Sequence, residues 1–313
     1  MIRLVEAYGG ALRYDPESYS PRDTMRVYSF GWMYWGAPRA LLELCTHSLV
    51  LLDWSRGPGR IFYRVYSTPG NRCWEDQLER LPWILGLDED LSGYRILARG
   101  DPLVGGVAEA MPGLRLRASS PWQALLVGVC QQNASFRQGW GMLYRLHLNA
   151  SERLVTPGGR VYLATPEPHT LTLDVLRASG LGYRAETVRR LLEARAHMLD
   201  CESLGEAAGV RGVGPYTLAL AWVLACRRYS ELPLDRWLKR LVAEAYEVPE
   251  ARAAEELTRR FNGWRGLAAL HTTIAFDAQP LRRALERLRR GLNKPGIDEP
   301  SPLTLWRTTP PPV

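Results

Sequence analysis

Residues 209–235 read GVRGVGPYTLALAWVLACRRYSELPLD, and this stretch tells more about the chain than any other. Gly212-Val213-Gly214 is a tight glycine turn that opens directly into an apolar helix. Because glycine permits positive φ and carries no Cβ, another molecule can approach the backbone amides of such a turn closely. The first amides of the helix are unpaired and lie at its positive dipole end. The turn is therefore predicted to bind one phosphate.

The same stretch ends in Asp235, directly behind Pro233 and Leu234. A phosphate anchor followed by a carboxylate on a rigid, proline-containing turn indicates cleavage of a nucleic acid rather than binding alone. An Asp after Pro-x is also a common helix cap, here for a helix over residues 236–246. One side chain can serve both purposes, and the glycine turn upstream favours catalysis.

The stretch resembles the helix-hairpin-helix DNA glycosylases, in which V-G-x-G-V-G is followed by a helix and then by hydrophobic-Pro-hydrophobic-Asp. Three further segments are similar to the family and occur in the expected order: WQALLVGVCQQNASFRQGWGMLYRL at 122–146, LGYRA at 181–185 and WRGLAALH at 264–271. The resemblance covers residues 110–290 and extends to both 3-methyladenine and 8-oxoguanine DNA glycosylases. It implies a mostly α fold with two helical subdomains of this glycosylase type.

The first hundred residues differ from the rest and predict an N-terminal antiparallel α+β domain. Tyr28, Phe30, Trp32 and Tyr34 recur at period two, which places four aromatic side chains on one face of a strand. That face is either packed against the sheet or a platform on which bases stack, and packing is the commoner outcome. Further strands are expected over 41–52 and 61–66, and a short helix over 74–85.

The chain is accordingly divided into three parts. Residues 1–105 form the N-terminal domain, and residues 106–295 form the helical glycosylase domain, with the helix-hairpin-helix at about 202–227. Pro121 marks the start of the first helix, with Ser119 or Ser120 as its cap. Residues 296–313 are expected to be a loose, Pro-rich tail.

Composition agrees with a globular enzyme that binds a polyanion. The 313-residue chain has 46% hydrophobic and 23% charged residues, a net charge of +7 and a pI near 9.3. A basic enzyme without a nucleic-acid partner would show the same charge. Of the 40 basic residues only Lys239 and Lys294 are lysine, which leaves almost no side-chain amine for a Schiff base.

The five cysteines are scattered, and none forms a CxxC pair that would indicate a zinc knuckle or an iron–sulfur loop. This scatter, with no signal peptide and no long apolar run, predicts a cytoplasmic, nucleoid-associated protein without a membrane partner.

The resemblance implies a DNA N-glycosylase of base excision repair that flips a damaged purine out of double-stranded DNA. Loss of the base leaves positive charge on the sugar, and a buried carboxylate stabilises that charge in the transition state. Asp235 is assigned this role, and it can also orient the attacking water. Gly212 and Gly214 would bind a DNA phosphate, with a monovalent cation as a candidate bridge, and Arg211 would add a phosphate contact. No other metal and no cofactor are expected.

Tyr216 distinguishes two subclasses of the family. Relatives that also nick the strand carry a lysine there, and its amine attacks the sugar, whereas a tyrosine cannot form a Schiff base. The chain is therefore predicted to be monofunctional. Lys239 lies one helical turn after Asp235 and could supply the missing amine, although pairing with a carboxylate or a phosphate is the simpler role. The alternatives are a bifunctional 8-oxoguanine-type glycosylase and abasic-site lyase using Lys239, and a non-catalytic DNA-binding hairpin protein.

An enzyme that extrudes a base must fill the gap it leaves. By resemblance, Asn133 and Tyr183 are assigned this wedge role, against an ordinary Asx turn and a core aromatic as the alternatives. The base pocket is assigned to Tyr216, Trp222, His271 and Phe276, and the last three could equally belong to the core. Alkylated purines would favour electron-rich aromatic walls and oxidised purines specific hydrogen bonds, and the sequence does not choose between them. A monomer is expected, because one flipped base needs one pocket.

Overall fold

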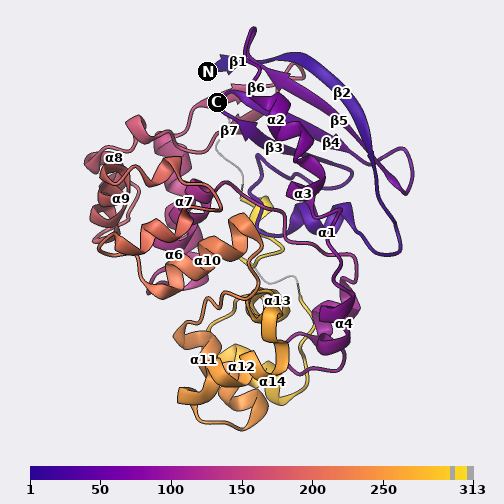
Figure 1. Ribbon diagram of the computed structural model, residues 1–313, viewed down its shortest axis with the longest axis vertical. Helices are drawn as coiled ribbons and strands as arrows, with labels where there is room; N and C mark the ends of the chain where they lie inside the picture. Colours follow the sequence, from indigo (N-terminus) through magenta and orange to yellow (C-terminus); the bar gives the residue numbers. More distant parts are fainter. Residues whose placement is uncertain (297–299, 309–313) are drawn as a thin grey trace.

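The computed structural model describes residues 1–296 and 300–308. It has a sheet region at one end and two groups of helices, so the expected mostly α fold with an N-terminal antiparallel region is confirmed (Figure 1). Five short helices belong to the N-terminal part of the chain: α1 (Pro21–Arg26), α2 (Trp74–Glu79), α3 (Leu81–Leu85), α4 (Ser92–Ala98) and α5 (Gly105–Ala110). The single helix expected over 74–85 is thus two helices, and the second has Pro82 in its first turn.

The main sheet is antiparallel, with the strand order β2-β5-β4-β3. Its strands are β2 (Val5–Arg13), β3 (Arg39–Cys45), β4 (Ser48–Asp53) and β5 (Arg60–Ser67). The strand expected over 61–66 is confirmed as β5, while the one expected over 41–52 is a hairpin that turns at His47, where φ is +58°. Leu49, Val50 and Leu52 of β4 are fully buried, and they anchor the sheet to the core.

The strand expected over the aromatic residues 28–34 is wrong. Tyr28 has φ of +52°, and the amides of Met33 and Tyr34 both donate to the carbonyl of Phe30, so the segment is a series of turns. The rings nevertheless pack inward, with Phe30 and Trp32 stacked at a centroid distance of 4.5 Å. The period of two therefore reflects packing of the turns and not a pleated strand.

A second, three-stranded sheet joins the start of the chain to the helical region. It has the order β1-β6-β7, with β1 (Ile2–Arg3) parallel to β6 (Arg153–Val155), and β6 antiparallel to β7 (Val161–Leu163). These pairings cross the boundary expected after residue 105.

The first helical group holds the hairpin. Its helices are α6 (Pro121–Gln131), α7 (Phe136–Ala150), α8 (Leu173–Ala178), α9 (Arg184–Glu193) and α10 (Pro215–Cys226). Ser120 caps α6 and Pro121 occupies its first turn, as the sequence predicts. Helices α6 and α10 pack closely at Gly128, where a Cβ would lie 2.9 Å from Cγ2 of Thr217. A glycine is required at that contact.

The second helical group lies at the far end of the molecule from the sheets, beside α4 (Figure 1). It consists of α11 (Arg236–Tyr246), α12 (Ala253–Phe261), α13 (Arg265–Ala275) and α14 (Leu281–Arg289). Helix α10 contacts α13 as well as α6, so it joins the two groups.

The described part of the C-terminal segment is not loose. Ser301, Leu303 and Leu305 are buried, and the carbonyl of Pro302 accepts from the amide of Tyr28 at 2.9 Å. The loose tail expected from residue 296 is therefore wrong for residues 300–308, because their apolar side chains are removed from water. Residues 297–299 and 309–313 of that tail lie outside the described residues.

Four of the five cysteines pair in space. Disulfides join Cys45 to Cys73 and Cys201 to Cys226, while Cys130 is free and buried. The paired cysteines are 28 and 25 residues apart, so their spacing in the sequence does not indicate which of them pair. The scatter of the cysteines is thus no argument for a reducing compartment, since disulfides are rare in the cytosol of mesophiles.

None of the helices in residues 1–296 and 300–308 combines the length and apolar character that a membrane crossing requires.

Candidate active site

The glycine turn precedes α10 as expected, although the first element of the hairpin is a 3-10 helix, η3 (Leu204–Gly209). Gly212 has φ of +106°, and a Cβ there would lie 2.3 Å from Oγ1 of Thr187 on α9. Gly214 is the N-cap of α10 with φ of −93°, and apart from its chain neighbours no described residue has an atom within 4 Å of the place where its Cβ would stand. The start of α10 therefore faces open space, as a phosphate site needs.

Gln132 connects the hairpin to the turn between α6 and α7. Its Nε2 donates to the carbonyl of Gly212 at 2.7 Å and to Oγ1 of Thr217 at 2.6 Å. The backbone carbonyl of Gln132 accepts from the guanidinium of Arg184. Three segments that are far apart in sequence are thereby fixed as one surface.

The two residues assigned to the wedge role meet on this surface. Nδ2 of Asn133 donates to the hydroxyl of Tyr183 at 3.4 Å, and Asn133 has φ of +45°. The Tyr183 side chain is 61% exposed, so it is not a core aromatic. An exposed aromatic beside an amide on a turn is suited to entering a base stack.

Asp235 is half-buried and caps α11. Its Oδ1 accepts from the amide of Leu238 at 2.7 Å, so the expected cap is present. Burial raises the pKa of the carboxyl, while hydrogen bonds from the backbone and the charge of Lys239 oppose that rise. One carboxylate oxygen is held by the helix, and the residue also borders a cavity.

The cavity has a volume of about 620 Å³ and lies where the two helical groups meet. Helices α6, α7 and α10 form one side, and the other consists of the start of α11, the end of α13 and the segment leading into α14. Its aromatic lining consists of Tyr28, Phe136, Trp140, Tyr216 and Trp237. Its polar lining includes Gln131, Ser135, Asp235, Thr273 and Gln279. A concave space with aromatic walls and a few polar groups is typical of a ligand site.

Tyr216 lines the cavity, as assigned. It is half-buried on α10, and burial together with the charge of Asp235 raises the pKa of its phenol. The side chains of Tyr216 and Asp235 therefore line the same cavity. Lys239, in contrast, is exposed and is not part of the cavity lining.

The other three residues assigned to the base pocket do not line the cavity. Nδ1 of His271 lies 2.9 Å from the hydroxyl of Tyr94, and burial lowers the pKa of the imidazole to about 3. The ring of Trp222 packs under the guanidinium of Arg228, 3.6 Å away, and Phe276 is fully buried. All three are buried core residues, and none of them is part of the lining of the cavity beside Asp235.

Sequence reasoning missed several residues of the cavity. Tyr28 comes from the aromatic segment that was expected to be a strand, and Phe136 and Trp140 lie on α7 behind the wedge turn. Asp277 and Ala278 follow α13, and both adopt positive φ, +55° and +49°. Only the aromatic pattern of residues 28–34 carried a signal, and it could not show where these rings point.

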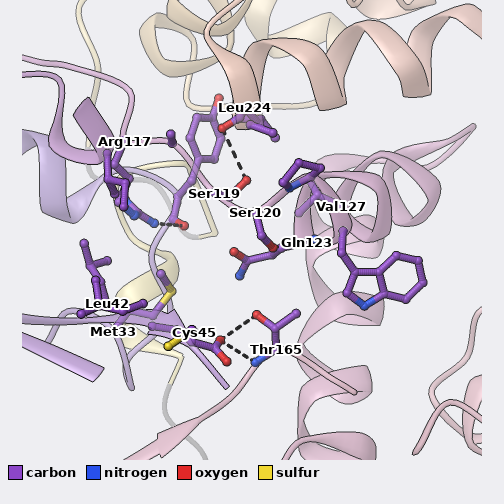
Figure 2. A pocket seen from close by; sticks show the side chains of 18 of the residues that line it. Met33, Leu42, Cys45, Arg117, Ser119, Ser120, Gln123, Val127, Thr165 and Leu224 are labelled. Atoms are coloured by element: carbon purple, nitrogen blue, oxygen red, sulfur yellow. Dashed lines mark hydrogen bonds between the residues drawn. The ribbon is translucent and has the colours of Figure 1, made fainter. Parts of the chain in front are cut away.

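A second cavity of about 460 Å³ adjoins the first and lies between β3 and α6 (Figure 2). Tyr28, Val127, Trp140 and Leu224 border both spaces. On the wall of the second cavity, one carboxylate oxygen of Glu43 accepts from the amide and the hydroxyl of Thr165, each at 2.7 Å. Burial raises the pKa of Glu43 to about 7. On another side of this cavity, the hydroxyl of Ser119 donates to the carbonyl of Leu224 (Figure 2).

Among the described residues, no three His, Cys, Asp or Glu side chains gather closely enough to hold a metal ion.

Comparison with known proteins agrees with this architecture. No family model matches the chain. It is similar to an 8-oxoguanine glycosylase/lyase of Clostridium acetobutylicum without DNA, with a TM-score of 0.61, 15% identity, and 86% of this chain and 97% of the other covered. The same bacterial enzyme in complex with double-stranded DNA containing cytosine opposite 8-oxoguanine gives a TM-score of 0.63 and 16% identity, over 86% and 95% of the two chains.

A curated sequence relative, an N-glycosylase/DNA lyase of Saccharomyces cerevisiae, is 24% identical over 175 residues. The match spans 48% of this chain and 46% of the yeast protein. The fold is thus that of the helix-hairpin-helix DNA glycosylases, as the sequence resemblance implies.

Proposed function

We propose that the protein is a DNA N-glycosylase of base excision repair that removes a damaged purine from double-stranded DNA. The observation that carries this proposal is the position of Asp235, half-buried on the wall of a cavity that also contains Tyr216 of the hairpin helix. The yeast and bacterial proteins to which the chain is similar are named as DNA glycosylases that also have lyase activity.

In this proposal, catalysis depends on the negative charge of Asp235. As the N-glycosidic bond breaks, positive charge develops on the sugar, and the carboxylate of Asp235 stabilises it more in the transition state than in the ground state. The amide of Leu238 fixes the side chain, so little reorganisation is needed. The same carboxylate orients or deprotonates the water that attacks the sugar.

DNA is held by the surface around the hairpin. Gly212 and Gly214 bind a phosphate of the damaged strand at the start of α10, and exposed Arg211 adds a charge-assisted contact. Asn133 and Tyr183 enter the duplex and fill the gap. A monovalent cation at the hairpin is compatible with this arrangement, and the enzyme acts as a monomer.

The enzyme is monofunctional in this proposal. Tyr216 stands where a lyase of the family carries its lysine, and a phenol forms no Schiff base. The bifunctional alternative requires Lys239 as the amine, but this side chain is exposed and is not part of the cavity lining.

The test is a panel of duplexes that each carry one lesion: 8-oxoguanine, hypoxanthine, 3-methyladenine, uracil or mismatched thymine. A monofunctional enzyme gives strand breaks only after alkali, and Asp235→Asn should slow base release at least about 100-fold while DNA affinity persists. Release that is unaffected by this substitution would falsify the assignment of Asp235. No release from any duplex, with tight DNA binding, would favour a non-catalytic hairpin protein.

Borohydride reduction separates the two enzymatic alternatives. A monofunctional enzyme leaves no covalent adduct with DNA. An adduct that forms with the native protein and is lost in Lys239→Gln would establish the lyase instead.

A further inference from the structure

The second cavity, between β3 and α6, takes no part in the reaction proposed for Asp235 (Figure 2). Its volume of about 460 Å³ is within the usual range of small-molecule sites, roughly 300–1,000 Å³. Its lining includes the aromatic residues Tyr28, Phe30, Trp83, Trp122 and Trp140. The cavity therefore has the size and the walls that a planar ligand needs.

One carboxylate oxygen on the wall of this cavity is free to bind a ligand. Oε2 of Glu43 accepts from Thr165, whereas Oε1 has no hydrogen-bond partner among the described residues. Oε1 is not one of the polar atoms that are sealed from solvent, and Glu43 is half-buried between the buried residues Leu42 and Leu44 of β3. A molecule in the cavity can therefore reach this oxygen.

Gln123 supplies a second free polar group. It lies in the first turn of α6, is half-buried, and points into the cavity in Figure 2. Its side-chain amide has no partner among the residues that the structure describes, and it is not sealed from solvent either. Because a side-chain amide both donates and accepts, it can bind a ligand edge of either kind.

The contact between Glu43 and Thr165 does not require an acid. Glutamine would accept the same two hydrogen bonds through its amide oxygen. Burial raises the pKa of Glu43 to about 7, so ionisation of this carboxyl lowers the stability of the fold as the pH rises towards neutrality. A carboxyl that destabilises the fold and lines a cavity is typical of a functional site.

The surrounding charges favour a ligand that donates hydrogen bonds to Glu43. Glu167 also lines the cavity, and its charge raises the pKa of Glu43 further. The guanidinium groups of Arg115 and Arg117 belong to the lining too, but both donate to backbone carbonyls. Arg80, the remaining arginine of the lining, is exposed and lies over the ring of Trp83.

We propose that the second cavity binds a free purine base, with an N–H group of the base donating to Oε1 of Glu43 and another polar atom of its edge bonding to the amide of Gln123. A purine is planar and carries both N–H donors and ring-nitrogen acceptors, which matches the aromatic walls and these two groups. This inference rests on the proposed function, because base release beside Asp235 is the source of the ligand. The two cavities share Tyr28, Val127 and Leu224, so the released base has an adjacent site to enter.

The test is calorimetric titration of the DNA-free protein with hypoxanthine at pH 8, where Glu43 is ionised. We expect Glu43→Gln to weaken binding about 10- to 100-fold. Thr165 would hold the amide oxygen of the new side chain, so its NH₂ group, a donor, would face the N–H group of the base. Gln123→Leu should weaken binding about 10-fold through the loss of one hydrogen bond.

Two matched controls locate the bound base. Glu75→Gln removes an acid from the surface of α2, outside both cavities, and Asp235→Asn alters the first cavity alone. Both variants should bind hypoxanthine as tightly as the native protein. Binding that is lost in Asp235→Asn but retained in Glu43→Gln would place the base in the first cavity and overturn the inference.

The remaining outcomes separate this inference from the proposed function. Glu43→Gln should release a damaged base from DNA at the native rate in single turnover, and a parallel loss of release and binding would make Glu43 a structural residue. No binding of hypoxanthine by a native protein that does release bases would overturn the second site alone. Glu43-dependent binding by a native protein that releases no base would establish the site and overturn the glycosylase.

Discussion

Asp235 shows how one side chain can serve the fold and the chemistry together. Its Oδ1 caps α11 through the amide of Leu238, and the residue also borders the cavity. Asparagine keeps an oxygen that can accept the same hydrogen bond but has no negative charge. Alanine loses both properties.

These two substitutions therefore separate stability from catalysis. We expect Asp235→Ala to lower the free energy of unfolding by about 1 kcal/mol, as loss of an N-cap does, and Asp235→Asn to change it by less than about 0.5 kcal/mol. Both should remove base release. Thermal unfolding and the lesion panel measure the two effects, and equal destabilisation by both substitutions would contradict the cap assignment.

Glu43 predicts a dependence of stability on pH. Burial raises its pKa from 4.5 to about 7, so the folded protein binds a proton more tightly than the unfolded chain. The native state therefore binds more protons between these two pKa values, and stability falls as the pH rises through that window. Glu43→Gln removes this pH dependence of stability. The amide oxygen of the new side chain can still accept the hydrogen bond from the amide of Thr165.

We expect Glu43→Gln to unfold at a higher temperature than the native protein at pH 8. The corresponding gain in the free energy of unfolding is on the order of 3 kcal/mol at most. At pH 4.5 the difference should be small. Thermal unfolding at both pH values, with Glu75→Gln on the surface of α2 as the control, measures this. A difference that does not depend on pH would show that the Glu43 carboxyl is ionised throughout the range.

The hairpin has two glycines with different requirements. Gly212 needs its positive φ and its contact with Thr187, whereas Gly214 has an ordinary φ of −93° and faces open space. The fold therefore requires a glycine at position 212. A glycine at position 214 is required only if another molecule approaches the turn.

Gly212→Ala should thus destabilise the protein by about 2 kcal/mol, because the new Cβ meets Thr187 and strains the turn. Gly214→Ala should leave stability within about 0.5 kcal/mol but weaken DNA binding about 10-fold, since its methyl group lies in the path of the phosphate. Unfolding curves and titrations with an abasic-site duplex distinguish the two. Unchanged affinity in Gly214→Ala would argue against a phosphate at this turn.

The Cys201–Cys226 disulfide encloses the hairpin, from just before η3 to the end of α10. Replacing both cysteines by serine should lower stability by about 2–4 kcal/mol and, because the hairpin loosens, also weaken DNA binding. The pair Cys45→Ser and Cys73→Ser is the matched control, since that disulfide lies at β3 and should affect stability alone. If the native protein unfolds at the same temperature with and without a reducing agent, the disulfides do not stabilise it.

The sequence predicts elements that are defined locally and fails where long-range contacts decide. The glycine turn, Pro121 and the Asp235 cap are each specified by neighbouring residues, and the structure has all three. The periodicity of residues 28–34 was misleading, because the positive φ of Tyr28 is imposed by contacts with Arg117 and Pro302. His271 and Trp222 were misplaced for a similar reason, since an apolar helix does not reveal which of its faces borders a cavity.

The arginines of the molecule differ in whether an acidic side chain neutralises them. Several arginines of α14 form ion pairs, among them Arg282 with Glu286 and Arg289 with Glu244. Such pairs cancel locally and contribute little to attraction over a distance. The net charge of +7 thus acts mainly through arginines outside these pairs, and exposed Arg211 beside the glycine turn is placed to meet a phosphate.

Salt dependence of DNA binding can test this distribution. Each phosphate contact releases counterions, so the logarithm of affinity falls linearly with the logarithm of salt concentration. Arg211→Ala should reduce the magnitude of that slope by about 1, with a similar loss of affinity for damaged and undamaged duplexes. Arg282→Ala is the matched control, because its side chain is 91% exposed but paired with Glu286, and its slope should equal that of the native protein. Equal slopes for all three proteins would place the DNA backbone away from the glycine turn, and a reduced slope in Arg282→Ala alone would place it along α14.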